Sequence, residues 1–229
     1  MRIASYNIHR CIGADGLYAP GRIHQVLQQL EAQVIGLQEV ETGPAHHELM
    51  QFLTRNPAWQ YIDGPTLQLE QGSYGNALLT CLPVLAEYRL DLSYRQREPR
   101  GAIDVRLQTD QGILRVIATH LGLRPAERRE QVRKLLRWIG PPREDPALTT
   151  VLLGDLNEWF LWGRPLRWLR NYFGTTSFPA TFHTRWPLFA LDRIWVYPGS
   201  RLQQIEILRN PQTRKASDHY PVVATLHRP

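Results

Sequence analysis

Short apolar runs alternate with an amphipathic segment at the start of this sequence. Residues 2–8 form a run with β-branched and aromatic side chains, residues 22–30 place apolar side chains at helical spacing, and residues 34–37 return to an apolar run. Apolar residues at every third or fourth position are typical of a helix that buries one face, whereas a continuous run of about four to eight is typical of a buried strand. The order strand, helix, strand therefore predicts an α/β fold whose helices lie outside the sheets.

The alternation continues to the end of the chain, and no repeat, low-complexity tract or linker interrupts it. The pair Gln111-Gly112 is a hairpin turn signal. Pro125 stands in the first turn of a long basic helix, where proline is tolerated. We therefore expect one domain over residues 1–229, with mixed sheets. Its further elements are predicted as helices at 47–53 and 125–139 and strands at 74–79, 102–107, 114–119, 148–153, 194–197, 203–208 and 222–226.

The positive charge of the chain is concentrated in its middle. There are 27 Lys and Arg residues against 21 Asp and Glu residues, for a formal net charge of +6, and the excess lies in residues 85–143. Of these cations 25 are arginines, whose planar guanidinium suits bidentate contacts with phosphate. A GC-rich codon usage produces the same bias, so the charge suggests a polyanionic partner without showing one.

The location of the protein is predicted from its apolar stretches and cysteines. The segment after Met1 is polar where a signal peptide needs an apolar stretch, and Cys11 and Cys81 are the only cysteines. The longest apolar stretch, residues 77–86, is shorter than the roughly 20 residues of a membrane span. We expect a reduced, cytoplasmic protein without a transmembrane segment, and a monomer.

Polar side chains recur where the apolar runs end. Buried polar groups are costly unless they are paired or bind a metal. Taken singly, each has a structural explanation, because asparagines cap turns, carboxylates pair with arginines, and core histidines accept hydrogen bonds. Six such places in one chain favour a shared functional site, and several carboxylates without a cysteine pair favour Mg²⁺ or Mn²⁺ over structural Zn²⁺. The residues are Asn7, Glu39, His120, Asp155 with Asn157, Asp192, and Asp218 with His219.

These residues lie within six ordered motifs. The motifs are Tyr6-Asn7, Leu37-Gln38-Glu39-Val40, Thr119-His120-Leu121, Gly154-Asp155-Leu156-Asn157, Leu191-Asp192-Arg193-Ile194 and Ser217-Asp218-His219-Tyr220-Pro221-Val222. In this order they resemble the endonuclease/exonuclease/phosphatase superfamily, which includes DNase I-like nucleases and sphingomyelinases. The resemblance implies a DNase I-like four-layer sandwich, in which two mixed β-sheets pack face to face between helices. It also implies hydrolysis of a phosphate ester at one end of the sandwich.

The resemblance implies that the site holds Mg²⁺ or Mn²⁺. Glu39 would be the principal metal ligand, with Asn7 beside it. Asp218 would reach the ion directly or through water. Such an ion neutralises the phosphoryl oxygens while an in-line water attacks the phosphorus.

The same resemblance implies catalytic roles for the remaining polar residues. Asp155 would orient and deprotonate the attacking water, while Asn157 and His120 would hydrogen-bond a non-bridging phosphate oxygen. Asp192 would fix the tautomer of His219 and raise its pKa, as a neighbouring anion does. Whether His219 or Asp155 takes the proton of the water stays open at this point.

Three further residues are candidates for substrate contacts. Arg100 opens a strand and resembles the arginine that family members place near the substrate phosphate, with Arg97 as its rival and an exposed strand-edge arginine as the alternative. Asn76 matches a family position near the site. His9 shares a strand face with Asn7 and reaches the mouth of the site, although a structural histidine fits the same pattern.

The leaving group is less constrained than the chemistry, because surrounding loops select it. Nucleic acid is the first expectation, since aromatics alternate with arginines in residues 159–170 as on a strand-binding surface. A core-facing helix explains part of that segment, because Leu166, Leu169 and Tyr172 follow helical spacing. A lipid headgroup or a small phosphate ester is the alternative substrate, with Trp159 and Trp162 at a membrane interface. A binding module without activity is disfavoured, because every expected catalytic position is filled.

Overall fold

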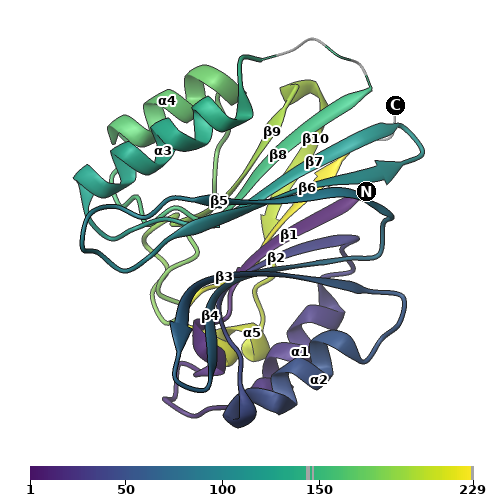
Figure 1. The fold of residues 1–229 in the computed structure, drawn as a ribbon, viewed down its shortest axis with the longest axis vertical. Coiled ribbons are helices and arrows are strands. Elements are labelled where there is room, and N and C mark those ends of the chain that lie inside the picture. Colours follow the sequence, from purple (N-terminus) through teal and green to yellow (C-terminus); the bar gives the residue numbers. More distant parts are fainter. Residues whose placement is uncertain (143–144, 146, 228–229) are drawn as a thin grey trace.

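Two β-sheets pack face to face in the computed structural model, which describes residues 1–142, 145 and 147–227 (Figure 1). Residues 143, 144, 146, 228 and 229 of the predicted domain lie outside the described residues. The six-stranded sheet contains, in spatial order, β10 (Leu202–Ile207), β11 (Val222–Leu226), β1 (Arg2–Asn7), β2 (Val34–Glu41), β4 (Gly72–Thr80) and β3 (Gln60–Leu69). The five-stranded sheet contains β5 (Val84–Asp91), β6 (Gly101–Thr109), β7 (Gly112–His120), β8 (Leu148–Asp155) and β9 (Asp192–Tyr197).

Helices cover the outer faces of both sheets, which confirms the predicted α/β sandwich (Figure 1). The six-stranded sheet packs against α1 (Pro20–Gln29) and α2 (His47–Thr54), and the short α5 (Pro211–Ala216) lies beside α1. The five-stranded sheet packs against α3 (Pro125–Ile139) and α4 (Arg164–Phe173). No helix in the described part of the chain is long and apolar enough to cross a membrane.

The central strands are buried on both faces because their side chains alternate between two cores. On β8, Val151 and Leu153 belong to the core between the sheets, whereas Leu152 packs beneath α3 and α4. Each such fully buried side chain contributes on the order of 1.5–3 kcal/mol. This explains why the central strands appear in the sequence as continuous apolar runs.

The sequence did not predict β3, β5 and α5. The first two are edge strands, and β3 contains Gly64-Pro65 while β5 has only exposed and half-buried side chains. Proline is tolerated at a sheet edge because an edge strand leaves N–H groups unpaired, so a turn signal in the sequence was compatible with a strand. The six residues of α5 are too few to show helical periodicity.

The polar residues meet because of the strand directions. β1 runs parallel to β2, and β7 runs parallel to β8, so the carboxyl ends of all four strands lie at one end of the sandwich. β9 and β11 run antiparallel to their neighbours β8 and β1, so their amino ends lie there too. His120 pairs with Asp155, and Asp155 pairs with Asp192, across adjacent strands.

Candidate active site

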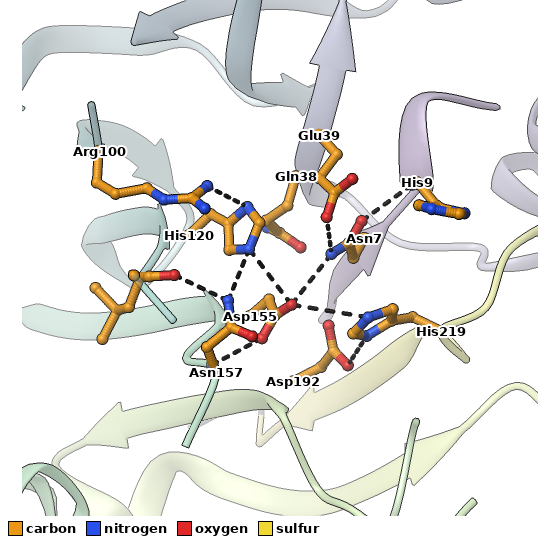
Figure 2. A network of polar contacts seen from close by, with 12 residues as sticks. Asn7, His9, Gln38, Glu39, Arg100, His120, Asp155, Asn157, Asp192 and His219 are labelled. Carbon is orange, nitrogen blue, oxygen red and sulfur yellow. Dashed lines mark hydrogen bonds and ion pairs between the residues drawn. The ribbon is translucent and has the colours of Figure 1, made fainter. Parts of the chain in front are cut away.

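The site lies where the core between the two sheets reaches this end of the sandwich. On β7, β8 and β9, the row of side chains facing the opposite sheet changes from apolar to polar at the residue nearest this end, and on β1 it is polar from Ser5 onward. In this way Ile3 and Ser5 lead to Asn7, Ala118 leads to His120, Leu153 leads to Asp155, and Ile194 leads to Asp192. Figure 2 shows the resulting network of polar contacts.

A β-bulge turns Glu39 toward this network. Leu37 and Val40 both pack beneath the helices, and the register of β2 with β4 shifts between them. Glu39 has a left-handed backbone with φ of 57°, which costs a non-glycine residue roughly 1–3 kcal/mol. Regular alternation would have placed its carboxylate with Leu37 under the helices. The bulge instead places it 3.0 Å from Asn7 Nδ2.

Asp155 is held by nitrogen atoms on several sides. Its Oδ1 accepts the backbone N–H of Asn157 at 2.8 Å, and its Oδ2 accepts Asn7 Nδ2 at 3.1 Å. His120 Nε2 and His219 Nε2 lie 3.5 Å and 3.8 Å from the same Oδ2 (Figure 2). These contacts fix the carboxylate in one orientation.

The turn that carries Asp155 requires a glycine at position 154. Gly154 has φ of 140°, and a Cβ there would overlap the carbonyl oxygen of Thr119 on the neighbouring strand. Asn157 also adopts a left-handed backbone, with φ of 49°. Its side-chain amide donates to the backbone oxygen of Leu121 at 2.9 Å and lies 3.0 Å from His120 Nε2.

His219 and Asp192 form a buried pair, as the resemblance implied. His219 Nδ1 lies 2.7 Å from Asp192 Oδ2, which also accepts the Thr181 hydroxyl at 2.6 Å. Burial alone would lower the pKa of His219, but the charges of Asp192 and Asp155 and the hydrogen bond to Asp192 outweigh it and raise the pKa to about 10. In these surroundings His219 is therefore an imidazolium at neutral pH.

His120 has the opposite electrostatic character. Burial is the main cause that lowers its pKa to about 3, and the nearby Arg100 and His219 charges act in the same direction, while Asp155 opposes them. His120 is therefore neutral at neutral pH. Arg100 NH1 lies 3.1 Å from His120 Nδ1 and Asn157 Nδ2 lies 3.0 Å from Nε2, and the neutral ring accepts a hydrogen bond from one of these two donors.

Arg100, rather than Arg97, reaches the site. The Arg100 side chain is 6% exposed and NH1 also pairs with Glu98 at 3.2 Å. Its Nε is buried without a hydrogen-bond partner among the described residues, so the guanidinium retains a free donor. Arg97 is exposed in the preceding loop.

His9 and Asp218 lie on the Asn7 side of the network. His9 Nδ1 lies 3.6 Å from Asp218 Oδ1, and the His9 backbone N–H donates to Asn7 Oδ1 at 3.0 Å. The Asn7 amide therefore presents its N–H to Glu39 and Asp155, and orients these two carboxylates. Asp218 Oδ1 lies 4.0 Å from His219 Nε2.

Asn76 is the predicted residue that does not join this network. It is buried and donates to the backbone oxygen of Gly101 at 3.1 Å, which ties β4 to the start of β6 beside Arg100. It thus supports the strand that carries the arginine.

Three residues were missed by the sequence analysis. Ser217 Oγ donates to the Asn7 backbone oxygen at 2.8 Å and accepts the His219 N–H, and its place before Asp218-His219 was a usable signal. Tyr74 interacts with Glu39 and Arg100, and burial is the main cause that raises its pKa. Thr181, which hydrogen-bonds Asp192, lies in a segment without hydrophobic periodicity, so no pattern pointed to it.

The arrangement of carboxylates fits a divalent cation. Asp155, Asp192 and His219 offer ligand atoms within 4.8 Å of one another, but a protonated imidazole has no lone pair for a metal. The part of the site around Glu39 is a better fit for a divalent cation. Burial raises the pKa of Glu39, and Asn7 is its one hydrogen-bond donor among the described residues. A hard cation would stabilise this carboxylate.

Comparison with known proteins identifies the family. Residues 4–219 match the family model described as the endonuclease/exonuclease/phosphatase family. The chain belongs to this family. Its sequence is 29% identical over 248 residues to the uncharacterized protein YbhP of Escherichia coli (strain K12), with 99% of this chain and 96% of YbhP covered. The family consists of phosphoesterases, so the resemblance drawn from the six motifs is confirmed.

Solved structures share the fold of this family member. An endonuclease/exonuclease/phosphatase from Beutenbergia cavernae superposes with a TM-score of 0.79 at 19% identity, over 99% of this chain and 71% of that chain. TDP2 of D. rerio complexed with single strand DNA product superposes with a TM-score of 0.73 at 17% identity, over 100% of this chain and 99% of that chain. Both likenesses confirm the sandwich of two mixed sheets.

Proposed function

We propose that the chain is a phosphodiester hydrolase that uses Mg²⁺ or Mn²⁺ and acts on nucleic acid. The observation that carries the proposal is the position of Asp155, which lies between the Asn7 amide, the His219–Asp192 pair and neutral His120. A carboxylate fixed in this way can orient a water molecule. The neighbouring Glu39 side provides the oxygen ligands for the cation.

The two parts of the site have different tasks. Glu39 and Asp218 hold the cation, which when bound neutralises charge on the phosphoryl oxygens. Asn7 orients Glu39 and Asp155 toward each other through one amide nitrogen. Arg100 binds a non-bridging phosphate oxygen with its free guanidinium donor.

Asp155 accepts the proton of the attacking water, and His219 donates a proton to the leaving oxygen. The Asp192 carboxylate at 2.7 Å from Nδ1 holds the imidazole with Nε2 directed toward the site. Neutral His120 and Asn157 lie on the other side of Asp155 and contact the phosphate through N–H groups. This division of roles is testable, because loss of a proton donor matters less when the leaving group is a weak base.

Nucleic acid is the favoured substrate because aromatic rings line the His219 side of the site. The Phe182 ring lies 4.8 Å from the His219 ring, Trp159 lies 5.5 Å from Phe182, and Phe189 lies 4.7 Å from Trp159. Trp159 is 36% exposed and offers a face for a base next to the scissile phosphate. The solved complex of TDP2 with single-stranded DNA is consistent with this choice.

A lipid headgroup is the second candidate, favoured by exposed apolar side chains in the same loops. Leu161 is 63% exposed, Trp162 75%, Trp186 77% and Leu188 76%. Leucine cannot stack on a base, whereas exposed tryptophan and leucine together suit a membrane interface. Within the predicted segment, residues 159–170, Leu166 and Leu169 of α4 are buried in the core, as their helical spacing indicated.

Cleavage assays distinguish the two substrates. Purified protein is incubated with supercoiled plasmid and labelled single-stranded DNA or RNA, with Mg²⁺ or Mn²⁺, and with vesicles that contain sphingomyelin or phosphatidylcholine. EDTA and His219→Ala serve as controls. We expect metal-dependent cleavage of nucleic acid that weakens steeply as salt rises, because phosphate binding releases counterions. Headgroup release from vesicles without nucleic acid cleavage would replace the first substrate with the second.

We further expect the protein to act in the cytoplasm as a monomer. Cys11 is buried and Cys81 is exposed, and both are free thiols, as in a reducing compartment.

A further inference from the structure

A second pocket lies behind the active site, on the outer face of β9. Side chains of this strand alternate, so Asp192 faces the catalytic network while Arg193 and Trp195 face the layer of α3 and α4. The outer pair lines a cavity of about 430 Å³ between β9, the start of α4 and residues 175–178. The β-sheet itself therefore separates this pocket from the inner face of β9.

Two residues that line this pocket carry buried hydrogen-bond donors without acceptors. Arg193 is 1% exposed, and its NH2 donates to the backbone oxygen of Glu158 at 3.1 Å. Arg193 NH1 and Trp195 Nε1 are both buried and find no hydrogen-bond partner in the part of the chain that the structure describes. An unsatisfied buried donor costs about 1–3 kcal/mol, so the two residues favour an acceptor bound in this pocket.

The charge of the pocket is positive. Arg170 from α4 also lines it, as do the hydroxyl-bearing residues Thr175, Thr176 and Ser177, and none of the described lining residues is acidic. The nearby carboxylate of Glu158 is already bound to Arg128 at 3.1 Å. The charges of Asp155, Glu158 and Asp192 also act on Arg193, but none of these carboxylates lines the pocket.

The remaining walls are apolar and aromatic. They consist of Leu161, Trp162, Leu166 and Phe178, and the Arg193 guanidinium lies 5.9 Å from the centre of the Phe178 ring. Such walls leave room for an organic group attached to the anion. Arginine forks and an indole N–H suit the tetrahedral oxygens of a phosphate.

We propose that this pocket binds a phosphate group through Arg193, Trp195 and Arg170. The phosphate is either free inorganic phosphate or the monoester of a small organic molecule, and its oxygens satisfy the two orphaned donors. The pocket is independent of the proposed hydrolysis, because its ligands lie on the opposite face of β9 from Asp192.

The indole N–H resonance of Trp195 reports directly on the proposed contact. ¹⁵N-labelled full-length protein is titrated in EDTA with inorganic phosphate and, separately, with adenosine monophosphate, and Trp195→Phe assigns the resonance. Potassium chloride at equal ionic strength is the control. We expect a saturable shift of this resonance with phosphate and no comparable shift with chloride. Tighter binding of the nucleotide than of phosphate would assign the site to a monoester, and equal binding to the free ion.

Variants test which side chains hold the anion. Arg170→Gln should weaken phosphate binding by about tenfold or more, because it removes a half-buried charge. Arg193→Gln should abolish it if the variant folds. Arg167→Gln, an exposed arginine of α4 that does not line the pocket, should leave binding unchanged. His219→Ala should also leave it unchanged, since the catalytic centre lies on the other face.

The inference is wrong if phosphate leaves the Trp195 resonance in place or shifts it no more than chloride does. It is equally wrong if Arg170→Gln binds phosphate with undiminished affinity. Loss of the shift in His219→Ala would place the phosphate in the catalytic centre and not behind β9. None of these results depends on whether the protein cleaves nucleic acid.

Discussion

The two carboxylates that flank Asn7 have different surroundings. Asp155, at the end of the five-stranded sheet, accepts two hydrogen bonds and faces two imidazoles. Glu39, on the six-stranded sheet, accepts one hydrogen bond among the described residues, and burial raises its pKa. The protein fixes Asp155 by itself, whereas a bound cation would stabilise Glu39. In the function that we propose, this difference separates the positioning of water from the binding of metal.

The largest effect is expected from the metal side. Glu39→Gln keeps the shape of the side chain but removes its charge, so we expect loss of metal-dependent turnover by about 10³-fold or more with an unchanged melting curve. Isothermal titration with Mn²⁺ should show weakened binding in this variant and near-normal binding in Asp155→Asn. Equal loss of Mn²⁺ affinity in both variants would contradict the proposal that Glu39 binds the metal while Asp155 positions water. Retained turnover in Glu39→Gln would exclude Glu39 as a metal ligand.

The Asp155 side is expected to affect the chemical step. Asp155→Asn and His219→Ala should each lower kcat by about 10²-fold or more, with smaller changes in KM. If His219 donates the proton to the leaving oxygen, its variant should lose much less activity on a p-nitrophenyl phosphodiester than on DNA, whereas Asp155→Asn should lose the same factor on both. A loss near tenfold would assign either residue to positioning alone.

A smaller effect is expected at Arg100, which we propose contacts substrate and not the cation. Arg100→Ala should raise KM about tenfold and reduce the steepness of the salt dependence by roughly one phosphate contact. Arg97→Ala, in the exposed loop three residues earlier, is the matched control and should change neither. An unchanged salt profile in Arg100→Ala, measured by cleavage rates at several salt concentrations, would argue against a phosphate contact.

The last effect concerns stability and not catalysis. The pKa of His120 is lowered to about 3, mainly by burial, so the unfolded chain binds a proton there below about pH 6.5 while the folded chain does not. His120 should therefore cost stability as pH falls from about 6.5 to 3, with a limiting slope of about 1.4 kcal/mol per pH unit. His120→Asn should make the urea-unfolding free energy less dependent on pH in this range. An identical slope in both proteins would contradict the buried neutral state.

Much of the fold could be predicted because the central strands and amphipathic helices carry strong periodicity. α3 and β11 were predicted with the bounds that the structure shows. The edge strands β3 and β5 escaped prediction, since an edge strand needs no continuous apolar run and tolerates Gly64-Pro65. The tertiary position, rather than local propensity, makes these segments strands.

The identity of the site residues could be predicted better than their contacts. The sequence placed Asn7 and Asp155 where apolar runs end, but the bulge that redirects Glu39 leaves no mark in Leu37-Gln38-Glu39-Val40. The sequence also left Arg97 and Arg100 as rivals. They are three positions apart, and the conformation of the loop between them determines which side chain reaches His120. Thr181 lies in a loop, where contacts depend on packing across the sandwich.

Metal-dependent hydrolysis of a phosphodiester is the central claim, and one assay tests it most directly. Turnover of bis(p-nitrophenyl) phosphate is followed with purified protein after treatment with EDTA and then after restoration of Mg²⁺ or Mn²⁺. We predict no turnover in EDTA and recovery on adding metal to the wild-type protein, with no recovery in Glu39→Gln. Turnover that EDTA does not change, or none from folded protein with either metal, would contradict the account.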